Sequence, residues 1–246
     1  MLKVKNVFYA DYFNLRKLGK EIIEIDRRIV SDFGGGSSLN KVNLMAALTF
    51  CFDIDVTLDI GVYRGKSLFP QALAHKFKKQ GIVLGIDPYS NSHAVQTDRK
   101  DIEKQLFEFA QNTNFEEIYN TVQKLISQQE LTKFAKIIRL PSDDAVSYVA
   151  ENFLNVGLIH IDGNHDTKHV MNDVLNYSPL IKSKGFIVLD DASWSSVVPA
   201  YNYLKDKMVL VGEVCKRNDD FALFSYGHSI TEIGRAKFLF ENIIKI

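Results

Sequence analysis

The chain has 246 residues, of which 46% are hydrophobic and 11% aromatic, and its 30 Lys and Arg balance 30 Asp and Glu. A zero net charge argues against a nucleic-acid-binding protein, which needs a basic excess, and against an acidic disordered regulator. No stretch reaches the ~18 apolar residues of a membrane span, and the N-terminus lacks the apolar run of a signal peptide. Two distant cysteines, Cys51 and Cys215, suggest neither a disulfide scaffold nor a zinc ribbon. We therefore expect a soluble, cytoplasmic protein that binds neither nucleic acid nor a membrane.

The N-terminal part, residues 1–52, has the apolar spacing of amphipathic helices, with a break at 34–38, where the sequence reads Gly-Gly-Gly-Ser-Ser. A flexible joint between two helices explains these glycines. A phosphate-cradling loop is the alternative, but no strand precedes the glycines and no Gly-Lys-Ser/Thr follows them. The second helix is predicted over 39–51. We expect this extension to act as a lid, or as a substrate or dimer contact.

From residue 53 to residue 228, short apolar runs alternate with amphipathic stretches, which is typical of βα units around a mainly parallel sheet. The predicted strands are 56–60, 82–86, 137–140, 156–161, 186–189, 208–214 and 221–226, the last two forming an antiparallel pair. The predicted helices are 67–79, 143–153, 167–181 and 195–206. The pattern therefore predicts an α/β fold with a Rossmann-like seven-stranded sheet and helices on both faces.

Two segments depart from this alternation. Residues 89–135 are too long for a plain crossover, so we expect a helical insertion over one edge or mouth of the sheet. Residues 229–246 are expected to form a short amphipathic helix or tail. This tail and the N-terminal helices can pack on the domain or on a second chain, and we expect a homodimer.

The first motif with chemical content is Asp59-Ile60-Gly61-Val62-Tyr63-Arg64-Gly65-Lys66-Ser67, which follows a predicted strand and opens a helix. Gly61 permits a tight turn, Gly65 lets a ligand approach the backbone, and Ser67 caps the helix or contacts the ligand. The glycines are four residues apart, so this is not the G-x-G-x-x-G fingerprint of dinucleotide binding. Asp59 repels a pyrophosphate and favours a ligand with an ammonium group over NAD.

Two other strand ends carry residues suited to a nucleoside. Asp87 ends strand 82–86, 22 positions after Gly65, where an acid suits hydrogen bonds to ribose hydroxyls. The alternative is that Asp87 only caps a turn. Ser142 and Asp143 follow strand 137–140, and they either cap the next helix or contact adenine.

Three further acids are predicted to meet at the same edge of the sheet. Asp162 ends strand 156–161, and Asp190 and Asp191 end strand 186–189. Neighbouring parallel strands lie ~4.8 Å apart, so the three carboxylates would converge. Like charges at that distance are costly unless a cation lies among them, and oxygen ligands suit Mg²⁺, with Mn²⁺ or Ca²⁺ as alternatives. The other interpretation is that these acids cap helices and never meet.

His165 lies three residues past Asp162 and, with an ordinary histidine pKa of ~6.5, is a candidate proton acceptor. Residues 163–166 read Gly-Asn-His-Asp, a motif that calcineurin-like metallophosphoesterases also carry. Those enzymes need an upstream D-x-H and a G-D-x-x-D, which this sequence lacks, so we treat the match as chance.

The motif at 59–67, followed in order by the acids at the later strand ends, resembles class I S-adenosylmethionine-dependent methyltransferases of the metal-dependent catechol and macrolide-sugar O-methyltransferase branches. The resemblance covers about 56–226, while 1–52 and 89–135 match loosely. It implies S-adenosylmethionine and Mg²⁺ as cofactors. The implied cofactor-binding residues are Asp59, Gly61, Tyr63, Gly65, Ser67, Asp87, Ser142 and Asp143, and the implied metal ligands are Asp162, Asp190 and Asp191.

The resemblance also implies a reaction. The sugar enzymes place a histidine three residues after the first metal ligand and the catechol enzymes a lysine, so His165 favours the sugar branch, although Asn164 replaces an acid common there. The implied reaction is Mg²⁺-assisted methyl transfer to a hydroxyl of a sugar or another small vicinal diol, with His165 and Asp162 as catalytic residues. Two alternatives stay open: a metal-independent methyltransferase of the same fold, and a non-catalytic nucleoside-binding protein.

Overall fold

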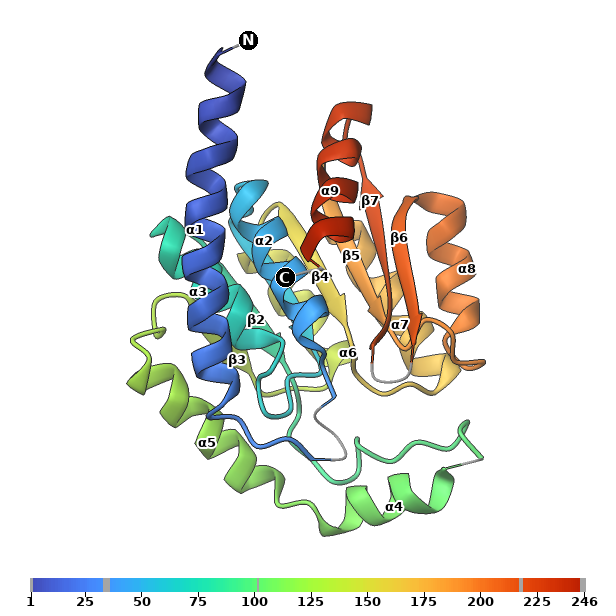
Figure 1. The fold of residues 1–246 in the computed structure, drawn as a ribbon. Coiled ribbons are helices and arrows are strands. Elements are labelled where there is room, and N and C mark those ends of the chain that lie inside the picture. The colour runs from blue at the N-terminus through green and yellow to red at the C-terminus, as the bar shows by residue number, and fades with distance from the viewer. Residues whose placement is uncertain (1, 33–35, 101, 217–218, 244–246) are drawn as a thin grey trace.

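The computed structural model describes residues 2–32, 36–100, 102–216 and 219–243. A single seven-stranded sheet runs through the middle of this chain (Figure 1). Its strands are β1 (Val56–Ile60), β2 (Ile82–Ile86), β3 (Ala135–Ile138), β4 (Val156–Ile161), β5 (Gly185–Asp190), β6 (Val209–Lys216) and β7 (Asp219–Tyr226). The helices are α1 (Leu2–Asp26), α2 (Leu39–Cys51), α3 (Leu68–Lys78), α4 (Glu103–Asn112), α5 (Phe115–Gln128), α6 (Ser142–Asn152), α7 (Thr167–Tyr177), α8 (Val198–Lys207) and α9 (Ile230–Ile243), with a 3₁₀ turn at Ser178–Leu180.

The strand order is β3-β2-β1-β4-β5-β7-β6. The first five strands are parallel, and β7 runs antiparallel to both β5 and β6. This confirms the predicted Rossmann-like sheet with its C-terminal antiparallel pair. The order reverses between β1 and β4, and in open parallel sheets ligands bind in the crevice that such a reversal leaves at the carboxyl ends of the strands.

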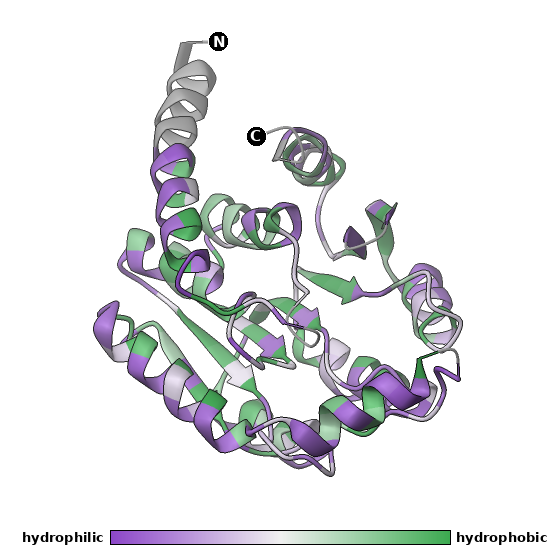
Figure 2. Ribbon diagram, turned by 60° about the horizontal axis from the view of Figure 1, so that its bottom comes forward, coloured by the Kyte–Doolittle hydropathy of each residue, from purple (hydrophilic) through white to green (hydrophobic). Residues whose placement is uncertain are grey.

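Helices cover both faces of the sheet, as expected from the strands' almost unbroken apolar runs. One apolar core joins the sheet to α1, α2, α3, α5 and α9, through residues such as Leu18, Leu44, Phe69, Ile118 and Phe240. A second core joins the opposite face to α6, α7 and α8, through residues such as Val149, Val174 and Leu204. With the lower edge turned forward, the strands lie among surrounding helices that alternate hydrophobic and hydrophilic residues (Figure 2).

Several predicted element bounds shift in the structure. Strand β3 occupies Ala135–Ile138 instead of 137–140, because Pro141 already precedes α6 and Leu140 is exposed. The predicted caps also differ. Neither Ser67 nor Ser142 makes a side-chain cap: the Ser67 hydroxyl donates to Asp59 instead, and Ser142 is itself the first residue of α6.

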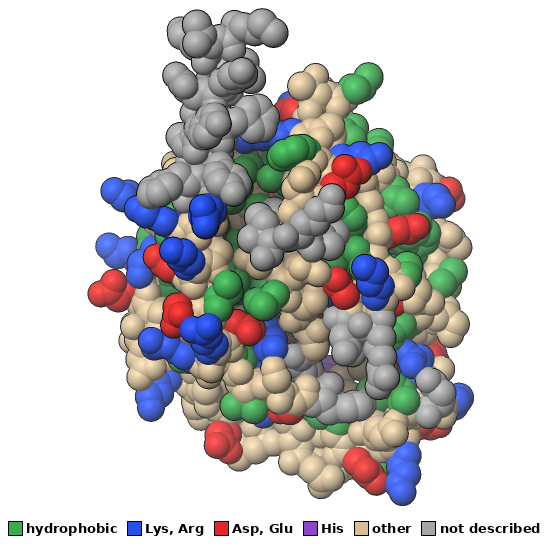
Figure 3. Space-filling view, in the orientation of Figure 1, with side chains coloured by type: hydrophobic (Ala, Val, Ile, Leu, Met, Phe, Trp, Pro, Cys, Tyr) green, Lys and Arg blue, Asp and Glu red, His purple; other side chains and the backbone are tan. Residues whose placement is uncertain are grey.

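No described helix is long and apolar enough to cross a membrane. On the face shown in Figure 3, basic and acidic side chains are interspersed, without a broad field of either sign. This surface matches the zero net charge of the chain.

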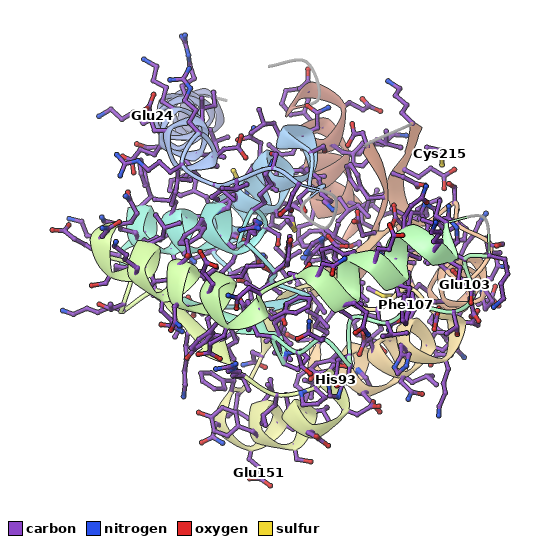
Figure 4. The ribbon with its side chains drawn as sticks, turned by 90° about the horizontal axis from the view of Figure 1, so that it is seen from below. Glu24, His93, Glu103, Phe107, Glu151 and Cys215 are labelled. Atoms are coloured by element: carbon purple, nitrogen blue, oxygen red, sulfur yellow. The ribbon has the colours of Figure 1, made fainter. Side chains whose placement is uncertain are left out.

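The insertion predicted at 89–135 forms α4 and α5. Seen from below, these helices lie across the carboxyl edge of the sheet, with His93, Glu103 and Phe107 on that side (Figure 4). The loop after β4 holds the insertion there. The Asp166 carboxylate accepts the backbone N–H groups of Thr97 and Asp98, both at 2.8 Å, and the Asn164 amide donates to the Val95 carbonyl at 2.7 Å.

Gly61 sets the distance between two loops at this edge. Its φ is +89°, a value that favours glycine, and a Cβ at this position would lie 2.0 Å from the carbonyl oxygen of Asp162. The amide of Gly61 also donates to the carbonyl of Ile86, 3.0 Å away. The loop after β1 can therefore lie directly against the end of β4 only because residue 61 has no side chain.

We predict that Gly61→Ala lowers the free energy of unfolding by about 2 kcal/mol or more, because a positive φ alone costs ~1–2 kcal/mol without glycine and the clash with Asp162 adds to it. Urea denaturation measures this. Gly234→Ala is the matched control: among the described residues, apart from its chain neighbours and the backbone of its own helix, no atom lies within 4 Å of its Cβ position in α9. Alanine also favours a helix over glycine by up to ~1 kcal/mol. Equal stability of the two variants would contradict the prediction.

Candidate active site

A cleft of about 1020 Å³ opens along the carboxyl edge of the sheet. Its walls come from the loop after β1, the ends of β2, β4 and β5, the start of α6, the start of α2 and the insertion. The predicted site residues that line it are Gly61, Tyr63, Ser67, Asp87, Ser142, Asp143, Asp162, His165, Asp190 and Asp191. Residues far apart in sequence thus share one cleft, whose volume suits a small-molecule ligand.

Asp87 joins the end of β2 to the loop after β1. Its carboxylate accepts the backbone N–H of Tyr63 at 2.8 Å and that of Tyr89 at 2.7 Å. Burial raises the pKa of Asp87 above its ordinary value, although these two hydrogen bonds oppose the shift. Both tyrosines have a positive φ, which turns the chain sharply on each side of the carboxylate. Asp87 therefore fixes the shape of the loop as well as facing the cleft.

Asp59 lies elsewhere than predicted. It is fully buried beneath the loop, outside the cleft wall, with its two oxygens engaged by neighbouring side chains. The Ser67 hydroxyl donates to Asp59 Oδ2 at 2.8 Å, and His160 Nδ1 lies 2.7 Å from Asp59 Oδ1. His160 is equally buried. Gly65 has a φ of +85° and packs against the Phe69 ring, where a Cβ would clash.

Ser142 and Asp143 lie where α6 meets α7. The Asp143 carboxylate accepts hydrogen bonds from Asn176 at 3.1 Å and Asn172 at 3.4 Å, and the Tyr177 hydroxyl donates to the Ser142 carbonyl at 2.6 Å. Next to them, burial raises the pKa of Asp173 to about 7. This end of the cleft is held by two helices that pack on the same face of the sheet.

Asp162, Asp190 and Asp191 meet at the middle of the edge, together with His165. His165 Nε2 lies 3.5 Å from Asp162 Oδ1 and 3.4 Å from Asp191 Oδ2. Two groups each have ligand atoms within 4.8 Å of one another: His160, Asp162 and Asp190, and His165, Asp190 and Asp191. The acids therefore do meet, and the alternative that they only cap helices is wrong.

A lysine from the N-terminal extension completes the cluster. Lys41 of α2 is only 3% exposed, and its Nζ lies 2.5 Å from Asp190 Oδ1 and 3.2 Å from Asp162 Oδ2. None of the sequence motifs includes Lys41. A signal was present: Lys41 is the one charged residue in the sequence of α2, whose other residues are mostly apolar and buried. A lone charge in such a helix needs a buried partner.

The charges of the cluster shift each other's pKa values. Burial would lower the pKa of Lys41, but Asp162 and Asp190 hold it above its ordinary value. Burial would raise the pKa of Asp162, but Lys41 and His165 hold it well below its usual range. Burial and the charge of Asp162 raise the pKa of Asp190, and burial raises that of Asp191 to about 6.

His165 has a defined orientation beside the cleft. Its ring packs on the Trp194 ring, with centroids 5.0 Å apart. The Arg99 guanidinium lies 3.7 Å from the centroid of the same Trp194 ring. Burial lowers the pKa of His165, but Asp162 and Asp191 outweigh this and raise it above its ordinary value. Within the described part of the chain, His165 Nε2 is a buried atom without a hydrogen-bond partner.

The cluster does not suit a divalent ion as it lies. Carboxylate oxygens are the donors that Mg²⁺ prefers. However, the ammonium of Lys41 already lies against Asp162 and Asp190, two of the three predicted ligands. An ion bound to the same two oxygens would face this ammonium at close range, and like charges there repel strongly.

Residues 58–192 match the model of a methyltransferase domain family, and this range is more than half of the chain. The chain belongs to this methyltransferase family. It is an S-adenosylmethionine-dependent methyltransferase, with the sheet order and the cleft at the strand ends described above. No curated protein matches its sequence.

Solved structures of other methyltransferases share the fold at low identity. The O-methyltransferase NovP is 12% identical, with 78% of this chain and 81% of that chain covered and a TM-score of 0.58. The O-methyltransferase TomG from Streptomyces achromogenes, involved in tomaymycin synthesis and solved with S-adenosylmethionine, is 11% identical, with 86% and 88% covered and a TM-score of 0.56. An O-methyltransferase from Bacillus cereus, solved with S-adenosylhomocysteine, is 11% identical, with 85% and 90% covered and a TM-score of 0.55.

We predict that Asp59→Ala lowers the free energy of unfolding of the methyltransferase by about 3 kcal/mol, because it leaves His160 and Ser67 without their buried partner. It should also weaken binding of S-adenosylhomocysteine, since the Ser67 side chain loses its anchor. Chemical denaturation and titration calorimetry measure the two effects. The matched control is Asp55→Ala, at the opposite end of β1, where the carboxylate is 55% exposed and the loss should stay below ~1 kcal/mol. Equal losses in both variants would contradict the prediction.

Proposed function

We propose that this methyltransferase transfers the methyl group of S-adenosylmethionine to a hydroxyl of a small molecule, a sugar or another vicinal diol, with His165 as the proton acceptor. The observation that carries this proposal is the placement of His165. Its Nε2 lies 3.5 Å from Asp162 and 3.4 Å from Asp191, and the residue lines the cleft, which supports a role in accepting a proton from a bound hydroxyl.

The cofactor-binding residues of the sequence analysis remain proposals with one change of role. Gly61, Tyr63, Gly65 and Ser67 would surround the methionine part of the cofactor, Asp87 the ribose, and Ser142 with Asp143 the adenine. Asp59 would act through Ser67 instead of touching the ligand, because both of its oxygens are already engaged. These residues other than Asp59 and Gly65 line one cleft, from the loop after β1 to the start of α6, which supports this order.

When bound, S-adenosylmethionine supplies a methyl group activated by a positively charged sulfur. The acceptor oxygen forms a bond to the methyl carbon as the carbon–sulfur bond breaks, and the electron pair of that bond stays on sulfur. The acceptor hydroxyl loses its proton to Nε2 of His165. Asp162 and Asp191, which lie 3.5 Å and 3.4 Å from this same nitrogen, would stabilise the positive charge of the imidazolium that results. Holding both reactants in one cleft supplies much of the acceleration.

Magnesium, which the sequence analysis placed on Asp162, Asp190 and Asp191, stays outside this mechanism. The three carboxylates offer the right oxygen donors, and a bound divalent ion would lower the pKa of an acceptor hydroxyl. Lys41 already contacts two of the three, so the present arrangement of the chain does not fit the ion.

The parts outside the sheet are proposed to form the acceptor site. We keep the division into an N-terminal extension (1–52), a methyltransferase domain (53–228) with the insertion 89–135, and a C-terminal helix (229–246). The extension contributes Lys41 to the cleft wall, and the insertion contributes Phe109 and Phe115. An acceptor bound there would meet an apolar wall on one side and the charged cluster on the other.

We predict that His165→Gln lowers kcat by about 10²–10⁴-fold, the usual contribution of a general base, while binding of S-adenosylhomocysteine is unchanged. Methyl transfer from labelled S-adenosylmethionine to a panel of sugars and catechols measures the first effect, and calorimetry the second. His165→Ala should regain part of its activity when imidazole is added. Full activity of His165→Gln on the best acceptor would rule out the proposed role.

The pH dependence follows from the raised pKa of His165. Only the neutral imidazole accepts a proton, so activity is low at acidic pH and rises as the pH passes the pKa of this group. We predict that kcat/KM rises with pH, with a midpoint above the ordinary value of a histidine, and that the rise disappears in His165→Gln. A midpoint below the ordinary histidine value would contradict the placement of His165 between two carboxylates.

A further inference from the structure

Lys41 is built into the cluster of strand-end carboxylates. Its side chain is 3% exposed, and its Nζ contacts Asp190 at 2.5 Å and Asp162 at 3.2 Å. A buried ammonium is costly unless it is paired and hydrogen-bonded, and its partners here are two of the three strand-end carboxylates. The contact therefore stabilises both the buried ammonium and the converging carboxylates.

The start of α2 is fastened so that Lys41 points into the cluster. Ser38 caps the helix by accepting the backbone N–H of Lys41 at 3.1 Å, and its hydroxyl donates to Asp219 at 2.5 Å. The Asn40 amide donates to the other oxygen of Asp219 at 3.0 Å. Asp219 begins β7, so the first turn of α2 is held against the sheet itself. Ser37 adds a contact to Asp162 at 3.4 Å.

One cation is what three converging carboxylates require. Without it, the repulsion among Asp162, Asp190 and Asp191 would protonate some of them or push their side chains apart. A divalent ion and the Lys41 ammonium cannot both bind the same oxygens of Asp162 and Asp190, because the two cations would be in contact. The chain carries its own cation at the place where the sequence analysis expected a metal.

We propose that Lys41 is the resident cation of this cluster and that it excludes divalent metal from the site, so that the methyltransferase works without one. Lys41 is a positioning residue: it holds Asp162 and Asp190 in place, and Asp162 in turn orients His165. The catalytic part of this inference rests on the proposed function, whereas the exclusion of metal does not.

Exchanging the lysine for a neutral side chain tests the proposal directly. Lys41→Met keeps most of the volume and removes the charge, which leaves three carboxylates beside His165 with oxygen donors suited to Mn²⁺. We expect the wild-type full-length chain to bind no Mn²⁺ at submillimolar concentration, by electron paramagnetic resonance of the free ion. Lys41→Met should gain one Mn²⁺ site, with affinity at least ~10-fold higher than that of the wild type, and Lys41→Met with Asp190→Asn should lose it.

Lys78 offers a matched control. It is also a buried lysine beside two carboxylates, 6% exposed and 3.0 Å from Asp53 and 3.6 Å from Asp55, but it lies on α3, outside the residues that line the cleft. Lys78→Met should gain no Mn²⁺ site. Lys41→Arg keeps the positive charge and should continue to exclude Mn²⁺, which distinguishes a charge effect from a general opening of the site.

Two results would overturn the proposal. One is a stoichiometric Mn²⁺ site in the wild-type chain. The other is a folded Lys41→Met variant, with normal melting and S-adenosylhomocysteine binding, that gains no Mn²⁺ site. If Lys41→Met does not fold, the wild type and Lys41→Arg still decide the question, because both must exclude the ion. Failure to methylate any hydroxyl acceptor would count against the proposed function alone, since Mn²⁺ binding is measured without an acceptor.

Discussion

Repulsion between carboxylates at the carboxyl edge of a parallel sheet is the constraint on which this site depends. The parallel pairing of β4 and β5 brings Asp162, Asp190 and Asp191 to one point, and their negative charges must be offset there. The offset comes from Lys41, a residue that enters from outside the sheet. The orientation of His165 and the pKa values of the acids depend in part on this balance of charges.

The N-terminal extension supplies the positive charge that the carboxylates require. Helix α2 packs on α3 and α9 over one face of the sheet, and its first turn is bonded to Asp219. Its apolar residues belong to the main core, while its single charged residue reaches the cleft. An element that resembles other methyltransferases only loosely in sequence therefore supplies a charge to the part of the chain that resembles them most.

The sheet was predictable because each strand is marked by a short pattern of neighbouring residues. Short apolar runs such as 56–60 and 156–161, which alternate with amphipathic stretches, predict strands, and the convergence of three acids follows from the ends of neighbouring parallel strands. Lys41 was not predictable in this way, because its contact with Asp162 joins residues 121 positions apart and no local pattern specifies such a pairing. The bond between Asp59 and Ser67 was not predictable either, because the sequence does not show that the Ser67 hydroxyl turns back toward the end of β1.

The tether between the loop after β4 and the insertion has a consequence for selectivity. The loop that carries His165 also carries Asn164 and Asp166, which hold the backbone of Val95, Thr97 and Asp98 above the cleft. If His165 is the base, as proposed, the backbone above the acceptor and the base that deprotonates it would therefore move together. A poorly fitting acceptor that displaces this backbone would also displace the base. Acceptors should therefore differ in kcat more than in KM. The enzyme would reject a wrong acceptor after admitting it.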